Sequence, residues 1–432
     1  MKENKEKDIS FLGRIIYFFR NTFDKIKAMR LPQRLVAHEK KLAGYNDEKP
    51  SSERKTAFYF RMIRFFVAIL FVVLILSVLL FSGNRFSYEN IYYMFKDVSF
   101  VSSYSESRPE TLNYSKAISN QSFSEFKNGL AVASDSEIKF FTSTGRVTMT
   151  QGSEFSNPLI LSSYDTSLVY DSGRNSFSLY NSFVQLYSEK LDYPIATADI
   201  CDDGSFLIVT KSKDYASTVR IYDQSFNLEE EYYKNDRVIS ARLSDNGKYC
   251  AVVSLDAKNG ESIVSLNVLK IGSDKLYSSV ELSGLMPYEC RFLSDDRVML
   301  ICSDRMFIYN LRGDIKKEFL YPSELIQVSS DADRCAMLFR GTQLNGDNRI
   351  YVFDQNGNSI FNGILNGNIS DMIYSNGYVY FLRGEDAVRI PASYIGGEEK
   401  ILSVGDGARL VGFKNGEILA CTSTTAYYLD FN

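Results

Sequence analysis

Hydrophobic residues follow three different patterns along the 432-residue chain. Residues 9–31 place large apolar side chains at helical spacing, and residues 65–81 form an almost unbroken apolar run. After residue 85, short apolar runs alternate with turn sequences, which is typical of β-strands. The patterns divide the chain into a tail, an apolar helix, a connector and a β domain, at residues 1–60, 61–83, 84–107 and 108–432.

The apolar run from Phe65 to Phe81 predicts a transmembrane helix. Ser77 is its one polar residue, and with its flanks the run reaches about 30 Å as a helix, the thickness of a bilayer core. A buried core helix would carry a polar stripe, and a cleaved signal peptide would end in a small-residue site that Leu80–Asn84 fits poorly. The side chains expected in the bilayer are those of Phe65, Phe66, Val67, Ile69, Leu70, Val72, Leu74, Leu76, Leu79 and Phe81.

Basic residues crowd the N-terminal flank of this run and predict its orientation. They are Arg54, Lys55, Arg61 and Arg64. By the positive-inside rule the N-terminus lies in the cytoplasm and the long C-terminal region lies outside the cell membrane. Residues 1–64 carry 16 Lys and Arg against 8 Asp and Glu, so their net charge is +8 and the rest of the chain carries −12. An acidic outer region argues against nucleic acid as its partner.

The tail contains a predicted amphipathic helix that ends at Pro32. Its apolar side chains share one face with helical spacing, and basic side chains accompany them; the apolar set is Phe11, Ile15, Phe18, Phe19, Phe23 and Ile26. Two interpretations stay open: the helix lies on an anionic inner leaflet, or it packs on a partner or on itself.

A repeat of strand, turn, apolar strand, turn and strand fills the region after Arg85. The first turn of each repeat falls at Asn128-Gly129, Tyr164-Asp165, Asp203-Gly204, Asn246-Gly247, Asp295-Asp296, 331–333, Asn376-Gly377 and Asn415-Gly416. From Gly129 to Gly416 the mean period is 41 residues, which is the length of a four-stranded propeller blade. We therefore predict an all-β, β-propeller fold with eight blades, or seven if one unit is not a blade. A pair of β-sandwiches is the alternative.

The chain ends also predict how such a ring closes. After Asn415-Gly416 only two strands remain, so the last blade lacks its outer strand. Residues around Thr111 to Ala117, ahead of the first repeat, are expected to supply it and so remove an exposed edge.

Composition restricts the chemistry of the outer domain. The chain has no Trp, and its single histidine, His38, lies in the tail. The outer domain therefore has no imidazole for a catalytic triad, a His-ligated zinc site or haem ligation. No cofactor, metal or catalytic residue is predicted. A carboxylate-based glycan hydrolase stays open, because such enzymes need only two acidic groups.

The cysteines and acidic turns are explained by structure rather than chemistry. The six cysteines show no Cys-x-x-Cys spacing, and Cys250 and Cys335 occupy the same place in different repeats. We therefore expect buried free thiols; one disulfide between neighbouring strands is the alternative. Turns such as 201–204 and 354–359 resemble calcium loops only distantly, and turn capping is the simpler interpretation. The run Glu229 to Glu231 is expected on an exposed outer strand.

The repeat pattern resembles the WD40 and quinoprotein-like propeller superfamily over about residues 108–432. The whole layout is similar to an uncharacterised bacterial single-pass membrane family whose extracytoplasmic propeller is a domain of unknown function. Without Trp, the Trp-Asp signature and the Trp docking motif of quinoprotein blades are both absent, so no quinone site is carried over.

These observations predict a membrane-anchored, non-enzymatic binding or scaffold protein. Its expected partners are the lipid bilayer and a protein bound at one face of the propeller. The alternatives are the glycan hydrolase and a sensor of a small extracellular solute.

Overall fold

A computed structural model describes residues 63, 65–73, 111–114, 120–273, 276–331, 334–341, 347–393 and 399–431. The chain forms two compact units, residues 1–78 and 79–432, and each is described by itself.

In the first unit, residues 65–73 are helical and their side chains are exposed. Six residues of the predicted span lie in this helix: Phe65, Phe66, Val67, Ile69, Leu70 and Val72. The remaining four, Leu74, Leu76, Leu79 and Phe81, lie outside the described residues, as do Arg54, Lys55, Arg61 and Arg64. Among the residues that are described, no helix has both the length and the apolar character needed to cross a membrane. The span therefore stays a prediction.

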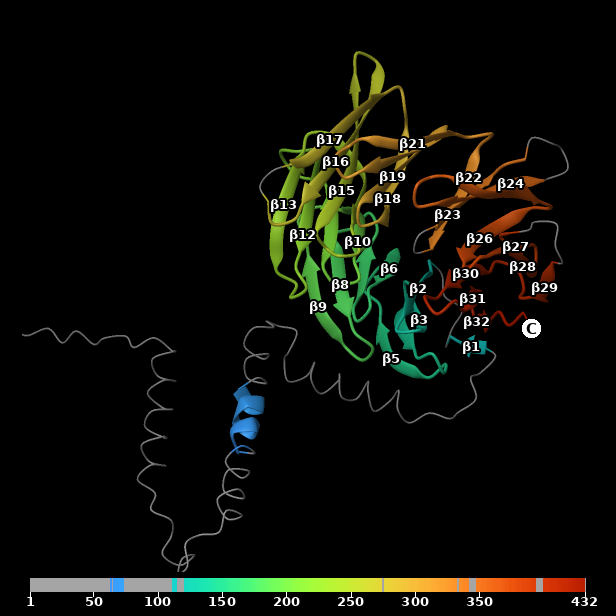
Figure 1. Ribbon diagram of the computed structural model, residues 1–432. Coiled ribbons are helices and arrows are strands. Elements are labelled where there is room, and N and C mark those ends of the chain that lie inside the picture. The colour runs from blue at the N-terminus through green and yellow to red at the C-terminus, as the bar shows by residue number, and fades with distance from the viewer. Residues whose placement is uncertain are drawn as a thin grey trace, which may run out of the picture. The chain divides into compact units, whose positions relative to one another are not determined.

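The second unit is an all-β propeller of eight blades, each a four-stranded antiparallel sheet (Figure 1). The first four blades are β2 (Ser122–Phe126), β3 (Gly129–Ala133), β4 (Glu137–Phe141), β5 (Val147–Gly152); β6 (Pro158–Ser162), β7 (Ser167–Asp171), β8 (Ser176–Tyr180), β9 (Gln185–Lys190); β10 (Ile195–Ile200), β11 (Phe206–Thr210), β12 (Ser217–Tyr222), β13 (Leu228–Lys234); and β14 (Arg237–Leu243), β15 (Tyr249–Lys258), β16 (Glu261–Lys270), β17 (Leu276–Ser283).

The last four blades are β18 (Pro287–Ser294), β19 (Arg297–Cys302), β20 (Arg305–Asn310), β21 (Ile315–Leu320); β22 (Leu325–Asp331), β23 (Arg334–Phe339), β24 (Asn348–Asp354), β25 (Ser359–Leu365); β26 (Ile369–Ser375), β27 (Tyr378–Arg383), β28 (Asp386–Pro391), β29 (Lys400–Ser403); and β30 (Arg409–Gly412), β31 (Ile418–Cys421), β32 (Thr425–Tyr428), β1 (Thr111–Asn113). The predicted count of eight is confirmed.

The eighth blade closes the ring with a strand from the other end of the domain. Strand β1 pairs with β32, and Leu112 lies opposite Ala426. The Tyr114 N–H donates to the Thr424 carbonyl at 2.9 Å, and Leu112 is 1% exposed. The predicted closure is confirmed, and the part of the sequence that supplies it is residues 111–113.

Seven of the predicted turns join the first and second strands of a blade, and residues 332 and 333 of the remaining one lie outside the described residues. We call the face of the ring that carries them the turn face. Gly247 and Gly416 show why two of these turns need glycine: φ is +64° and +87°, and a Cβ would meet Asp203 and Asn376 of the preceding blades. Neighbouring turns therefore pack against each other around the ring.

The core lies between blades rather than inside one sheet. Every residue of β3, β7, β11 and β31 is buried, whereas the outermost strands β17 and β21 are mostly exposed. One cluster joins the fifth and sixth blades through Met299, Ile308, Met337 and Phe353. Each large apolar side chain buried in this way stabilises the ring by roughly 1.5–3 kcal/mol.

The cysteines belong to this core. All six are buried and free, which confirms the predicted free thiols. Cys250 and Cys335 are each the second residue of their strands, β15 and β23, as the repeat predicts. Burial raises the pKa of Cys290 to about 11, so that thiol stays protonated at neutral pH.

Candidate functional site

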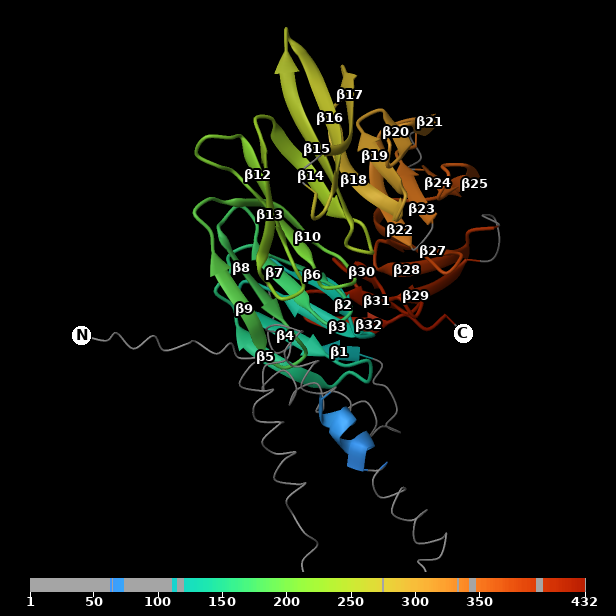
Figure 2. The same ribbon diagram turned by 60° about the vertical axis from the view of Figure 1, so that its left-hand side comes forward.

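The first strand of each blade lies on the inner side of the ring, and we call the region that these strands surround the central channel (Figure 2). These strands are β2, β6, β10, β14, β18, β22, β26 and β30. Several residue contacts join each successive pair from β22 through β30 and β2 to β18, and Arg291 of β18 donates a hydrogen bond to Ser330 of β22. Each is the edge strand of its own sheet, so its outer backbone groups need partners in the next blade.

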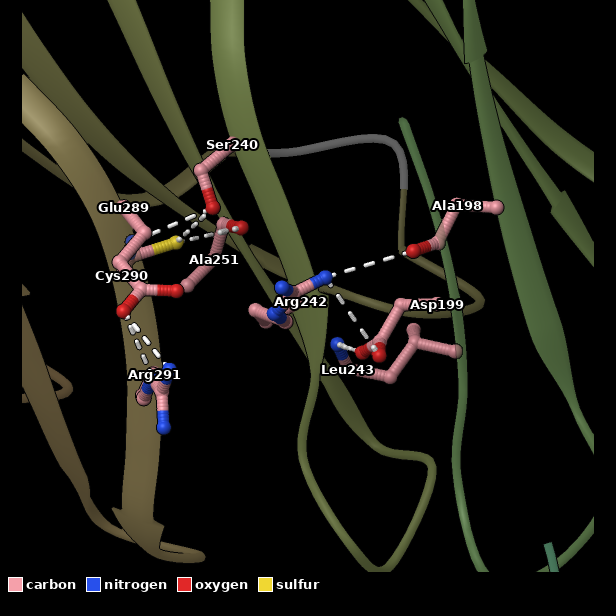
Figure 3. A network of polar contacts seen from close by, with 9 residues as sticks. All are labelled: Ala198, Asp199, Ser240, Arg242, Leu243, Ala251, Glu289, Cys290 and Arg291. Atoms are coloured by element: carbon pink, nitrogen blue, oxygen red, sulfur yellow. Dashed lines mark hydrogen bonds and ion pairs between the residues drawn. The ribbon is translucent and has the colours of Figure 1, made fainter. Parts of the chain in front are cut away.

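Polar side chains of the inner strands supply several of those partners (Figure 3). The Asp199 carboxylate accepts from the Leu243 N–H at 2.8 Å, and the Ser240 hydroxyl accepts from the Cys290 N–H at 3.1 Å. These two contacts tie the third blade to the fourth and the fourth to the fifth. The same arrangement joins Ser122 to Ile160, Ser329 to Tyr374 and Asp371 to Leu410.

Charged side chains in the channel wall are paired with one another. Arg242 lies 3.7 Å from the Asp199 carboxylate and donates to the Ala198 carbonyl at 3.3 Å. Burial raises the pKa of Asp199, although the charge of Arg242 and the Leu243 N–H oppose the shift. Arg291 pairs with Glu289 at 2.8 Å and donates to Ser330 in the next blade. These groups hold neighbouring blades together, so their charges and hydrogen-bonding atoms are already used in contacts within the ring.

The mouth of the channel on the turn face is acidic. Lys414 Nζ of the eighth blade lies 2.7 Å from Asp202 Oδ1 of the third. These blades are not neighbours in the ring, so the ion pair reaches across the mouth. Burial raises the pKa of Glu125, whose carboxylate accepts from the Lys414 N–H at 2.7 Å. Burial also raises the pKa of Asp245, and the charges of Asp202 and Asp295 add to the effect.

Three cavities open along one side of the channel, and Phe123 lines all of them. The cavity near the turn face has about 500 Å³ and includes Glu125, Tyr164 and Lys414. A second, of about 530 Å³, lies between β2, β22, β26 and β30, and a third has about 390 Å³. Volumes of this size suit a small ligand.

The acidic residues noted in the sequence lie in turns or on an outer strand, and the contacts described below give them structural roles. Burial alone would raise the pKa of Asp354, but the N–H groups of its own turn, at Asn358 and Asn356, hold it below its ordinary value. Asp203 likewise accepts from the Ser205 N–H at 2.7 Å. Glu229 to Glu231 lie on β13, the outermost strand of the third blade, as predicted, but only Glu229 is exposed. Glu230 and Glu231 are half-buried, and Glu231 pairs with Arg220.

Three groups that matter in the channel escaped sequence reasoning: Asp199, Asp371 and Arg409. Asp199 and Asp371 lie within the first strands of their blades, where a β-bulge near the start of β10 and β26 changes which residues face the channel, and Arg409 is the first residue of β30. Throughout the described ranges, no group of three His, Cys, Asp or Glu side chains is placed to hold a metal ion. His38 lies outside those ranges.

Comparison with known proteins gives a family. Residues 100–393 match the model of a family of unknown function, DUF5711, and the chain belongs to that family. No curated protein matches.

Several solved structures are similar. BamB from Moraxella catarrhalis is 10% identical with a TM-score of 0.49, over 75% of this chain and 99% of that one. Kluyveromyces lactis Hsv2 is 12% identical with a TM-score of 0.45, over 65% and 96%. Chaetomium thermophilum Raptor is 12% identical with a TM-score of 0.45, over 74% of this chain and 29% of that one.

Proposed function

We propose that this member of the DUF5711 family is a membrane-anchored binding or scaffold protein without enzymatic activity. The apolar run 65–81 holds it in the cytoplasmic membrane, and the basic tail stays inside. The eight-bladed ring lies outside the membrane and presents a protein-binding face.

The observation that carries the proposal is that charged side chains of the channel wall bind neighbouring blades of the ring. Asp199, Arg242 and Arg291 are engaged with neighbouring blades, and the arrangement builds a rigid ring rather than a catalytic pair. A glycan hydrolase needs two carboxyl groups on either side of a sugar-binding groove, one of which is free to give a proton.

Net charge indicates the kind of partner. The residues after 64 carry a net charge of −12. A field of that sign attracts a partner surface with a net positive charge and speeds its association at low ionic strength.

Crosslinking in native membranes, followed by identification of captured proteins, tests the scaffold function. We expect one defined protein to be recovered with the full chain, and its yield to fall as salt is raised during binding. Recovery of no protein, together with turnover of cell-surface polysaccharide by the purified chain, would contradict the proposal and favour the hydrolase.

Thiol labelling tests the orientation. Because all six native cysteines are buried, an engineered thiol at an exposed position stands out against a low background. Ser283, at the exposed end of β17, supplies the outer position, and Ser52 of the tail supplies the inner control. On intact cells a membrane-impermeant maleimide should label Ser283→Cys but not Ser52→Cys, and lysis should expose both. The reverse pattern would invert the topology.

A further inference from the structure

Arg409, the first residue of β30, is a cation of the channel wall whose side chain makes no hydrogen bond or ion pair within the described part of the chain. Its side chain is exposed, and it lines two of the channel cavities. By contrast, Arg242 and Arg291 in the same wall are held by Asp199 and Glu289. An unpaired guanidinium beside a cavity offers five donors in a fixed planar arrangement.

The one acidic side chain among the residues that line these two cavities already has hydrogen-bond partners. Asp371 accepts from the Leu410 N–H at 2.7 Å, from the Gln327 side chain at 2.6 Å and from the Met372 N–H at 2.9 Å. Its two oxygens are therefore committed to the junction between blades. This leaves the charge of Arg409 available to a ligand.

Apolar side chains form part of the mixed polar and apolar walls around Arg409. The cavity of about 530 Å³ is lined by Phe123, Ile326 and Leu410, together with the hydroxyls of Ser122 and Ser370. The adjoining cavity of about 390 Å³ shares Phe123 and Arg409 and adds Leu159. One cation, two hydroxyls and an apolar floor are the elements of a site for a small amphiphilic anion.

We propose that Arg409 and these two cavities bind a small organic monocarboxylate with an apolar body. The carboxylate takes two parallel hydrogen bonds from the guanidinium, and the body lies against Phe123 and Ile326. A single negative charge fits best, because the site offers one unpaired cation inside a domain of strongly negative net charge. This site is independent of the scaffold function proposed above, since it needs neither a protein partner nor the membrane.

The probe for the test is 3-phenylpropionate, compared with its neutral amide. The full chain in phospholipid nanodiscs is dialysed to equilibrium against each compound, with empty nanodiscs as the reference for partition into lipid. For a ligand of this size we expect a Kd of about 1 mM. The amide should bind at least tenfold more weakly, because it loses the charge-assisted hydrogen bonds.

Two variants locate the site. Arg409→Gln should weaken binding of 3-phenylpropionate at least tenfold. Arg312→Gln, which removes the same charge from an exposed turn outside both cavities, should leave it within twofold. Equal binding of acid and amide, unchanged binding by Arg409→Gln, or the absence of saturable binding up to about 10 mM would each overturn the proposal. If Arg409→Gln does not fold, the comparison of acid and amide on the unaltered chain decides the question.

Discussion

The fourth and eighth blades follow the same four-stranded plan and are held together in opposite ways. In the fourth, β15 and β16 run for ten residues each in an unbroken hairpin, which projects from the ring in Figure 2. In the eighth, three strands have four residues each, and β1, with three, comes from the other end of the domain.

The difference shows what closes the ring. Three register pairs join β1 to β32, so backbone pairing contributes little at this junction. Burial replaces it, because Leu112 and Tyr114 pack into a cluster with Leu130 of the first blade and Leu419 of the eighth. The clasp therefore depends on two side chains, whereas the fourth blade depends on its long ladder.

The largest expected effect comes from the clasp. Leu112→Ala should lower the free energy of unfolding by about 3 kcal/mol, because it leaves a cavity in a fully buried cluster. Lys258→Ala, at the exposed tip of the long hairpin, should change it by less than about 0.5 kcal/mol. Urea unfolding followed by far-ultraviolet circular dichroism measures both. Equal effects would mean that ring closure does not depend on Leu112.

A smaller effect is expected from the side chains that tie each of these blades to its predecessor. Asp199 holds the fourth blade at Leu243, and Asp371 holds the eighth at Leu410. Asp199→Ala should cost about 2 kcal/mol and Asp371→Ala about 1 kcal/mol, because the first also leaves Arg242 without its carboxylate in a partly buried place.

The same unfolding measurement applies to this pair, and the double variant Asp199→Ala with Arg242→Met gives the control. It should recover part of the loss, because no unpaired cation then remains. A double variant that is no more stable than Asp199→Ala alone would assign the whole cost to the Leu243 N–H.

Local chemistry explains why the ring was predictable from sequence. Turn pairs such as Asn246-Gly247 and Asn415-Gly416 mark the first hairpin of a blade, because the φ values of +64° and +87° favour glycine. The missing strand of the last blade was predictable from the same count of strands and turns.

The contacts between blades were not predictable, because they depend on register. A bulge between Val238 and Ser240 shifts the alternation of β14, so that Ser240 points to the next blade and Arg242 to Asp199. Arg409 was hidden for another reason. Only the folded ring shows which of the 49 basic residues face a cavity without a partner.

The smallest expected effect on stability comes from a charge at the channel mouth. Asp245, in the first turn of the fourth blade, interacts electrostatically with Lys414 of the eighth blade. Partial burial raises the pKa of Asp245 above its ordinary value of 3.8, the charges of Asp202 and Asp295 add to this, and Lys414 opposes it. A raised pKa means that the folded chain holds this proton more tightly than the unfolded chain. The resulting stability is therefore present below about pH 3.8 and is lost as the pH rises through the folded pKa.

Asp245→Asn should therefore stabilise the chain at pH 7, by less than about 0.5 kcal/mol because the group is exposed, and should have no effect near pH 3.5. Asp354→Asn is the control of opposite sign. The pKa of Asp354 is lowered, so its ionised form stabilises the fold above pH 3.8, and its loss should destabilise the chain at pH 7. If both variants shift the unfolding midpoint in the same direction at pH 7, the prediction is contradicted. The attraction of Lys414 for the Asp245 carboxylate would then fully offset its burial and the repulsion from Asp202 and Asp295.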